Sequence, residues 1–212
     1  DGLMHFYPYV SLQKLVAENI SANKGMSILD LGAGSGNQTV LLADTGSSIV
    51  AVDNSKSMLV RLRKKIRGNH DNKVTVIESD LLAYLKTEKS SKFDAIAMVN
   101  VLYTVTDREL LWRELLRVLK PKGRIIVTNS DKGGSLSIIR EHTQHKGILS
   151  LLRPRLIAVF VIDSLISEMA KTGHFSFISQ DKIESEVKRA GGSFNYVTRC
   201  YGDVNILFTV TK

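Results

Sequence analysis

The stretch Ile28–Gly36 reads ILDLGAGSG and decides the fold. It begins as a short apolar run typical of a β-strand, continues through three glycines and leads into a helical run at Asn37–Asp44. Glycines at a strand-to-helix turn let the backbone bend sharply and let a ligand approach without a Cβ in the way. The stretch therefore predicts a glycine-rich cofactor loop, with a purely structural tight turn as the alternative.

The spacing of these glycines separates the loop from a dinucleotide-binding one. The dinucleotide fingerprint places its third glycine five residues after the first, and this sequence has Asn37 at that position. Asp30, which precedes the loop, would repel a pyrophosphate but would suit a cationic amino group. We therefore expect a cofactor that carries an amino group, and neither NAD nor FAD.

Short strand-like runs alternate with helical periods on both sides of this loop. Strands that alternate with helices pair in parallel, because a parallel crossover needs a long connection. The near-continuous apolar runs also suit strands that are covered on both faces. The sequence predicts an α/β sheet, with strands at 27–31, 48–53, 73–78, 93–99 and 124–129 and helices at 37–44, 56–67 and 107–119.

The rhythm changes after the fifth strand. Residues 133–177 contain helical apolar patches, and a helix at 181–190 then precedes two strands at 194–201 and 205–211. The short turn between those strands forces an antiparallel hairpin. We expect one domain over 1–212, with 133–177 as a helical lid over the substrate. A helix pair packed on the sheet edge and a homodimer interface are the alternatives for that insertion.

Polar residues follow several of the predicted strands. Asp53 ends the second strand, where a carboxylate can accept hydrogen bonds from both ribose hydroxyls of a nucleoside. Asp80 follows the third strand and could accept a hydrogen bond from an adenine amino group, and Asn100 follows the fourth. All lie at the sheet edge where open α/β folds bind ligands. A helix N-cap is the alternative for Asp53, and a solvated loop for Asp80.

With these features the sequence resembles the class I S-adenosylmethionine-dependent methyltransferases, and more narrowly their small-molecule, ubiquinone-biosynthesis-type group. The likeness rests on the glycine loop, on VAVDNSKSML at 50–59, on Ser79-Asp80, on FDAIAMVNVLYTV at 93–105 and on LRVLKPKGRIIV at 116–127. It covers roughly residues 25–130 and the closing hairpin, and it is specific for fold and cofactor but not for the substrate.

The resemblance implies a Rossmann-like, doubly wound sheet ordered 3-2-1-4-5-7-6 with strand 7 antiparallel. It implies S-adenosylmethionine as cofactor and S-adenosylhomocysteine as product. It also implies that the cofactor is held by Asp30, Gly32, Ala33, Gly34, Gly36, Asp53, Asn54, Asp80, Leu81 and Asn100.

The candidates for catalysis lie outside the glycine loop. Many relatives carry a histidine where this chain has Tyr103, and a phenol is a poorer general base because its unperturbed pKa is far higher. Tyr103 is therefore expected to position the substrate, with a core aromatic as the alternative. His142 and His145 lie one helical turn apart, either as solvated helix residues or as a base near the substrate. A metal site would need further ligands, so none is expected.

The composition restricts the partners. A net charge of +8 can attract nucleic acid, anionic membranes or acidic substrates. The basic helix that carries Arg61, Arg63, Lys64, Lys65 and Arg67 lacks aromatic support for RNA. It is interpreted as a solvated face, and nucleic acid is not expected as a partner.

The chain has one cysteine, Cys200, and its longest clean apolar run, 156–162, is too short to span a bilayer. Its first residues lack the pattern of a secretory signal, so a reducing cytoplasm is expected. The expected activity is methyl transfer to the O or N of a small, partly apolar metabolite, with contacts from Tyr7 and Tyr9. An RNA methyltransferase, an aminopropyltransferase and a cofactor-binding module without catalysis remain alternatives.

Overall fold

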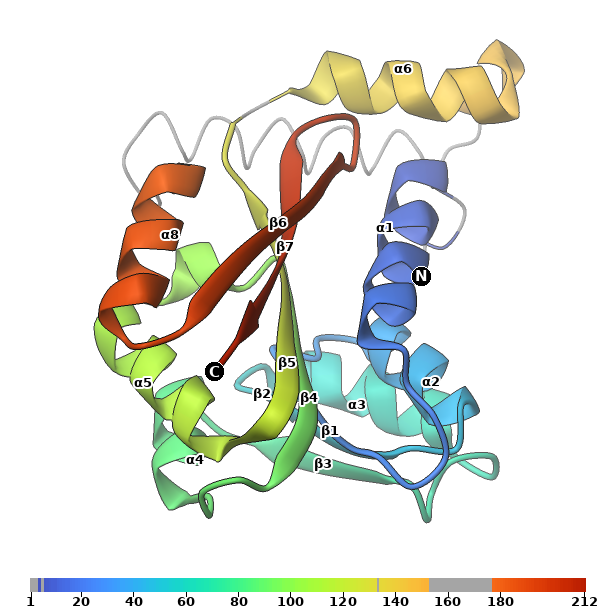
Figure 1. Ribbon diagram of the computed structural model, residues 1–212. Coiled ribbons are helices and arrows are strands. Elements are labelled where there is room, and N and C mark those ends of the chain that lie inside the picture. The colour runs from blue at the N-terminus through green and yellow to red at the C-terminus, as the bar shows by residue number, and fades with distance from the viewer. Residues whose placement is uncertain (1–3, 5, 133, 153–176) are drawn as a thin grey trace.

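Seven strands form one sheet in the computed structural model, which describes residues 4, 6–132, 134–152 and 177–212 (Figure 1). The order is β3-β2-β1-β4-β5-β7-β6, with β7 antiparallel to both of its neighbours. The expected order and the closing hairpin are thus confirmed. The strands are β1 (Ser27–Leu31), β2 (Ser48–Asp53), β3 (Val74–Glu78), β4 (Phe93–Val99), β5 (Leu119–Ser130), β6 (Ser193–Cys200) and β7 (Asn205–Thr211).

Helices cover both faces of the sheet, as a doubly wound fold requires (Figure 1). One apolar cluster joins the sheet to α1 (Tyr7–Ile20), α2 (Asn37–Asp44) and α3 (Lys56–Ile66) through residues such as Leu12, Leu42 and Leu62. The other joins it to the helices of the opposite face through Tyr84, Trp112 and Ile183. Those helices are α4 (Leu81–Thr87), α5 (Arg108–Val118) and α8 (Gln180–Arg189).

The insertion after β5 is described in part. It contains α6 (Ser135–Lys146) and a 3₁₀ helix, η3 (Ile148–Leu152), and α6 lies at the end of the molecule toward which β5 runs (Figure 1). Residues 153–176, which make up most of the expected lid, lie outside the described residues. The lid and the division of the chain into one domain with a subdomain therefore stay predictions.

The expected elements agree with the structure to within one residue at their ends, apart from β5. That strand begins at Leu119, whereas we expected it to begin at Arg124 after a helix terminator. Leu119 has an extended backbone and pairs with Phe93, and the ladder resumes at Ala95 after an irregularity. Residues 120–123 are therefore a distortion within a long strand. Helices α1 and α4 were not expected from the sequence.

A buried ion pair fastens α8 to α5. The Arg108 guanidinium donates to the Glu186 carboxylate through Nη2 at 2.8 Å and through Nε at 2.9 Å. Burial alone would raise the pKa of Glu186, but the hydrogen bonds and the charge of Arg108 outweigh it and lower that pKa. The Glu186 carboxylate is thus charged in the folded protein, and the stability of the fold depends on its pairing with Arg108.

We expect Arg108→Met to lower the free energy of unfolding at pH 7 by about 3 kcal/mol, because it leaves a buried carboxylate unpaired. Urea unfolding measures this, and Arg113→Met, at an exposed position of the same helix, should change it by under about 0.5 kcal/mol. The difference should shrink in acid, because a carboxylate with a lowered folded pKa loses its contribution as the pH falls through that pKa. Equal losses in the two variants would contradict the assignment.

Candidate cofactor-binding site

A pocket of about 340 Å³ opens where the parallel strands end. It is formed by the turns that follow β1, β2, β3 and β4, so four separate segments contribute to one wall. The lining residues are Gly32, Asp53, Asn54, Leu81, Val99, Asn100, Val101 and Thr104. The structure thus brings together Gly32, Asp53, Asn54, Leu81 and Asn100, all expected at the cofactor from the sequence.

The glycines of the loop serve different purposes. A Cβ on Gly32 would lie 2.3 Å from Val101 Cγ2, and one on Gly36 would lie 2.6 Å from Leu62 Cγ. These two glycines are required by packing, as the tight-turn alternative proposed. Gly34 also has a positive φ, of +53°, but an added Cβ would meet nothing within 4 Å. Gly34 is therefore the loop glycine whose Cβ position faces open space.

Asp53 joins two turns of the pocket. Its Oδ2 accepts a hydrogen bond from the backbone N–H of Gly34, and its Oδ1 accepts one from Ser55, each at 2.8 Å. The N-cap position of α3 belongs to Ser55 and not to Asp53. A carboxylate has about four lone-pair positions, so one that has accepted two hydrogen bonds can still accept others from a ligand.

Asp30 is buried behind the glycine loop, with 2% of its surface exposed. Its Oδ2 accepts a hydrogen bond from the Thr39 hydroxyl at 2.6 Å. Burial raises the pKa of Asp30 to about 6. Because this carboxylate is not among the residues that line the described pocket, its influence on a bound amino group is electrostatic.

Asp80 and Asn100 are both tied to the backbone or to neighbouring strands. Asp80 Oδ1 accepts from the Ala83 N–H at 2.9 Å and caps α4, and the residue is exposed to solvent. Asn100 Oδ1 accepts from Asn205 Nδ2 at 2.6 Å and from the Thr128 hydroxyl at 3.2 Å. These contacts link the pocket to the closing hairpin.

The sequence did not reveal a chain of polar contacts beside the loop. Asn37 Nδ2 donates to the Tyr9 hydroxyl at 2.9 Å, and the Lys65 ammonium donates to Asn37 Oδ1. These bonds connect α1, α2 and α3 at the start of α2. Lys65, which we expected on a solvated face, is partly buried, and burial lowers its pKa. No local pattern could have indicated contacts between residues 28 positions apart.

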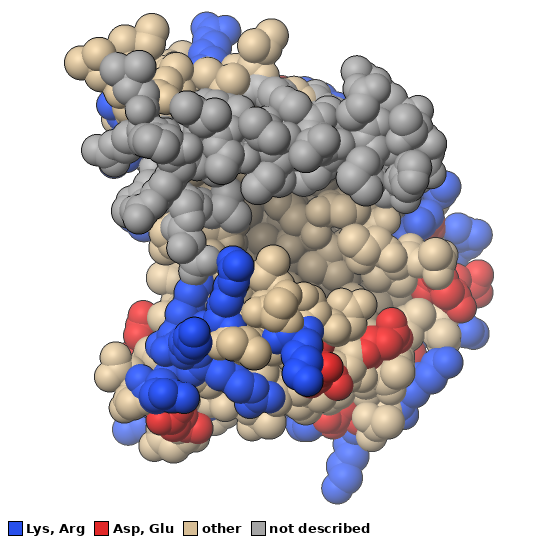
Figure 2. Space-filling model, turned by 180° about the vertical axis from the view of Figure 1, so that it is seen from behind, with Lys and Arg blue, Asp and Glu red and all other residues tan. Residues whose placement is uncertain are grey.

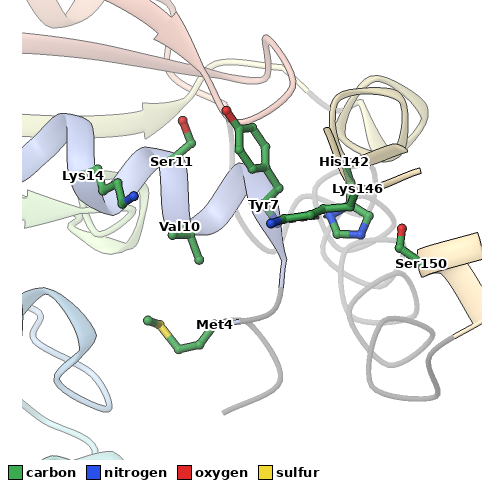
Figure 3. A pocket seen from close by; sticks show the side chains of 8 residues that line it. All are labelled: Met4, Tyr7, Val10, Ser11, Lys14, His142, Lys146 and Ser150. Atoms are coloured by element: carbon green, nitrogen blue, oxygen red, sulfur yellow. Dashed lines mark hydrogen bonds between the residues drawn. The ribbon is translucent and has the colours of Figure 1, made fainter. Parts of the chain in front are cut away.

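A second cavity, of about 410 Å³, lies between α1 and the α6–η3 segment (Figure 3). His142 is buried there and not solvated, and its Nδ1 accepts from the Tyr7 backbone N–H at 3.1 Å. His145 is exposed, and its ring stacks on that of Tyr7 with 3.8 Å between centroids. The cavity is lined by Met4, Tyr7, Val10, Ser11, Lys14, His142, Lys146 and Ser150.

Tyr103 is separate from both histidines in this arrangement. It lies in a 3₁₀ turn, η2 (Leu102–Thr104), packs against the apolar cluster of α5, and is not among the residues that line either cavity. Burial raises its pKa, which makes it a still poorer base at neutral pH. Its positioning role stays a prediction.

The described ranges hold neither a metal-ligand cluster nor a membrane-spanning helix. No three His, Cys, Asp or Glu side chains gather there as a metal ion would require. None of the helices in those ranges has both the length and the apolar character that crossing a bilayer demands.

Known proteins resemble this chain in the same region. A family described as a methyltransferase domain matches residues 29–127. The demethylmenaquinone methyltransferase of Clavibacter sepedonicus is 38% identical over 103 residues, which are 49% of this chain and 40% of that protein. The ubiquinone/menaquinone biosynthesis C-methyltransferase UbiE of Shewanella halifaxensis is 30% identical over 141 residues, or 62% and 53% of the two chains. The chain thus matches about half the length of these curated relatives.

Solved structures share the fold across nearly the whole chain. A SAM-dependent methyltransferase from Aquifex aeolicus has a TM-score of 0.63 at 17% identity, covering 93% of this chain and 87% of that one. The family match, the strand order and the glycine loop together support a class I S-adenosylmethionine-dependent methyltransferase. Within that class its relatives are of the ubiquinone-biosynthesis type, and the cofactor of the class is S-adenosylmethionine.

We expect Asp53→Ala to weaken S-adenosylhomocysteine binding by about 1.5–3 kcal/mol, because hydrogen bonds to a charged group are lost. Isothermal titration calorimetry measures this. Asp71→Ala is the matched control, since the Asp71 carboxylate accepts from the Gly68 N–H at 2.8 Å in a turn outside the pocket. Wild-type affinity in Asp53→Ala would contradict the assignment of Asp53 to the cofactor site.

We also expect S-adenosylhomocysteine to bind about fivefold more tightly at pH 7 than at pH 5. Asp30, with its pKa raised to about 6, is protonated at the lower pH and attracts an ammonium group only once ionised. Asp30→Asn should remove this dependence. Methylthioadenosine lacks the α-amino group of S-adenosylhomocysteine, so its binding should not depend on pH in this way. An equal pH effect on both ligands would contradict the role of Asp30.

Proposed function

We propose that this chain transfers the methyl group of S-adenosylmethionine to a small, partly apolar metabolite. The observation that carries the proposal is the pocket at the ends of four strands, which Asp53 lines while its carboxylate accepts a hydrogen bond from the Gly34 N–H of the glycine loop. The match of residues 29–127 to a methyltransferase domain supports the same assignment.

The bound cofactor supplies a methyl group that its sulfonium already activates. The protein therefore has to orient two molecules and exclude water more than it has to activate either one. In this proposal Asp53 holds the ribose, Asp80 and Leu81 lie at the adenine, and Asp30 balances the charge of the amino group. The backbone at Ala33 and Asn100 completes the contact surface.

The cavity between α1 and α6–η3 supports an acceptor that is apolar in one part and polar in another. Met4, Val10 and the Tyr7 ring offer apolar surface, and Lys14 and Lys146 offer positive charge. The hydrogen bond between Tyr9 and Asn37 holds this end of α1 beside the glycine loop. We infer that residues 133–177 cover the acceptor as a lid, and that α6 and η3 are its described part.

The two histidines differ in what they could do to an acceptor. His142 accepts a hydrogen bond at Nδ1, so its ring proton is on Nε2, which can donate but not abstract a proton. His145 Nδ1 faces the Glu141 carbonyl oxygen at 2.9 Å and must donate, which leaves Nε2 as the basic atom. If the acceptor needs a base, His145 is the better candidate. Because some relatives are named as C-methyltransferases, carbon is a candidate acceptor atom alongside oxygen and nitrogen.

A single turnover experiment separates this function from its rivals. The full chain is incubated with S-adenosylmethionine and a panel of hydroquinones, phenols and primary amines, and products are quantified by mass spectrometry. We expect S-adenosylhomocysteine to form in proportion to a methylated small molecule, with NMR of the product assigning the C, O or N atom.

Parallel reactions test each rival directly. Methylthioadenosine released from decarboxylated cofactor would indicate an aminopropyltransferase, and turnover stimulated by RNA would indicate an RNA methyltransferase. Tight S-adenosylhomocysteine binding without turnover on any acceptor would indicate a binding module. Each of these results would overturn the proposed activity.

A further inference from the structure

Helix α3 presents a surface whose charges are not balanced. Residues 54–70 contain six lysines and arginines and no acidic residue. Several cations elsewhere in the described chain form ion pairs, as in Lys92–Glu88, Lys120–Asp94 and Arg199–Asp131. We define the basic face as six of the exposed side chains that α3 and the residue after it present, namely Lys56, Met58, Val60, Arg61, Lys64 and Arg67.

The cations of this face have no partners within the described part of the chain. Lys56, Arg61, Lys64 and Arg67 form neither a hydrogen bond nor an ion pair with a described residue. Arg63 donates to a backbone carbonyl and Lys65 contacts Asn37, so these two are excluded from the face. The remaining four charges are free to meet an anionic partner.

Aliphatic side chains lie among these charges. Val60 is 48% exposed and Met58 is 39% exposed, whereas Leu59, Leu62 and Ile66 of the same helix are buried against the sheet. The two exposed side chains lie outside the apolar clusters of the core. A helix that exposes aliphatic groups among lysines and arginines has the composition of a surface that lies on a membrane.

The position of the face relates it to the pocket. Helix α3 begins two residues after Asn54, which lines the cofactor pocket. Figure 2 shows lysine and arginine side chains gathered below a hollow on this side of the molecule. The start of the basic face, at Lys56, thus follows the pocket lining closely in the chain.

We propose that the basic face docks the protein on an anionic lipid surface, with its cations at the lipid phosphates and Val60 and Met58 at the level of the headgroups. Each cation near such a surface strengthens binding about fivefold. RNA is the less suitable partner, because residues 54–70 contain no Phe, Tyr or Trp on which bases could stack. His70 of this stretch is buried and faces Asp44.

Vesicle co-sedimentation of the full chain tests the proposal. We expect binding to vesicles of phosphatidylcholine with one-third phosphatidylglycerol, weakening as salt is added, and none to phosphatidylcholine alone. The double variant Arg61→Gln/Lys64→Gln should bind about 30-fold more weakly. Val60→Ser should weaken binding while leaving its salt dependence unchanged.

The control variant also removes two positive charges, but from the opposite side of the sheet. Lys182→Gln/Arg189→Gln, at exposed positions of α8, should bind vesicles like the wild type. Equal losses in both double variants would mean that only net charge matters, and would overturn the proposal. So would retained vesicle binding in Arg61→Gln/Lys64→Gln together with lost binding to single-stranded RNA. Thermal melting and S-adenosylhomocysteine titration of each variant separate lost docking from lost folding or a lost cofactor site.

Discussion

The carboxylate of Asp53 holds together the two turns from which the cofactor pocket is built. It accepts one hydrogen bond from the glycine loop at Gly34 and one from the start of the next turn at Ser55. Just before it, the Val52 carbonyl oxygen accepts from the N–H groups of Gly32 and Ala33 at 2.8 and 3.0 Å. The end of β2 therefore sets the path of the loop after β1, and the same residue that would hold a ribose also shapes the surface beneath it.

The loop contains glycine for two different physical reasons, which are close packing and access for a ligand. Gly32 and Gly36 have no room for a Cβ, because Val101 and Leu62 already occupy that space. Gly34 has room, and there the absence of a side chain leaves the backbone open to a ligand. Fold and cofactor site thus share one loop. A side chain added at Gly32 or Gly36 would disturb the packing, and one added at Gly34 would obstruct the ligand.

The features that the sequence predicts are those set by local pattern. The strand–glycine–helix run, the alternation of strands and helices and the short Gly202-Asp203 turn predict the parallel sheet and its closing hairpin, and the family resemblance implies the strand order that is observed. Helix α1 could have been found, because Leu12, Val16 and Ile20 repeat at helical spacing and Pro8 stands at its start. The contact between Tyr7 and His142 could not, because it joins residues 135 positions apart.

The central expectation is that the cofactor lies at the C-terminal edge of β1, β2 and β3. A ¹⁵N NMR titration of the full chain with S-adenosylhomocysteine measures this residue by residue. The account predicts saturable, one-to-one shifts in the amides of Gly32, Gly34, Asn54 and Leu81. Shifts confined instead to the cavity at the opposite edge of the sheet, which Lys122 and Arg124 line, would contradict it.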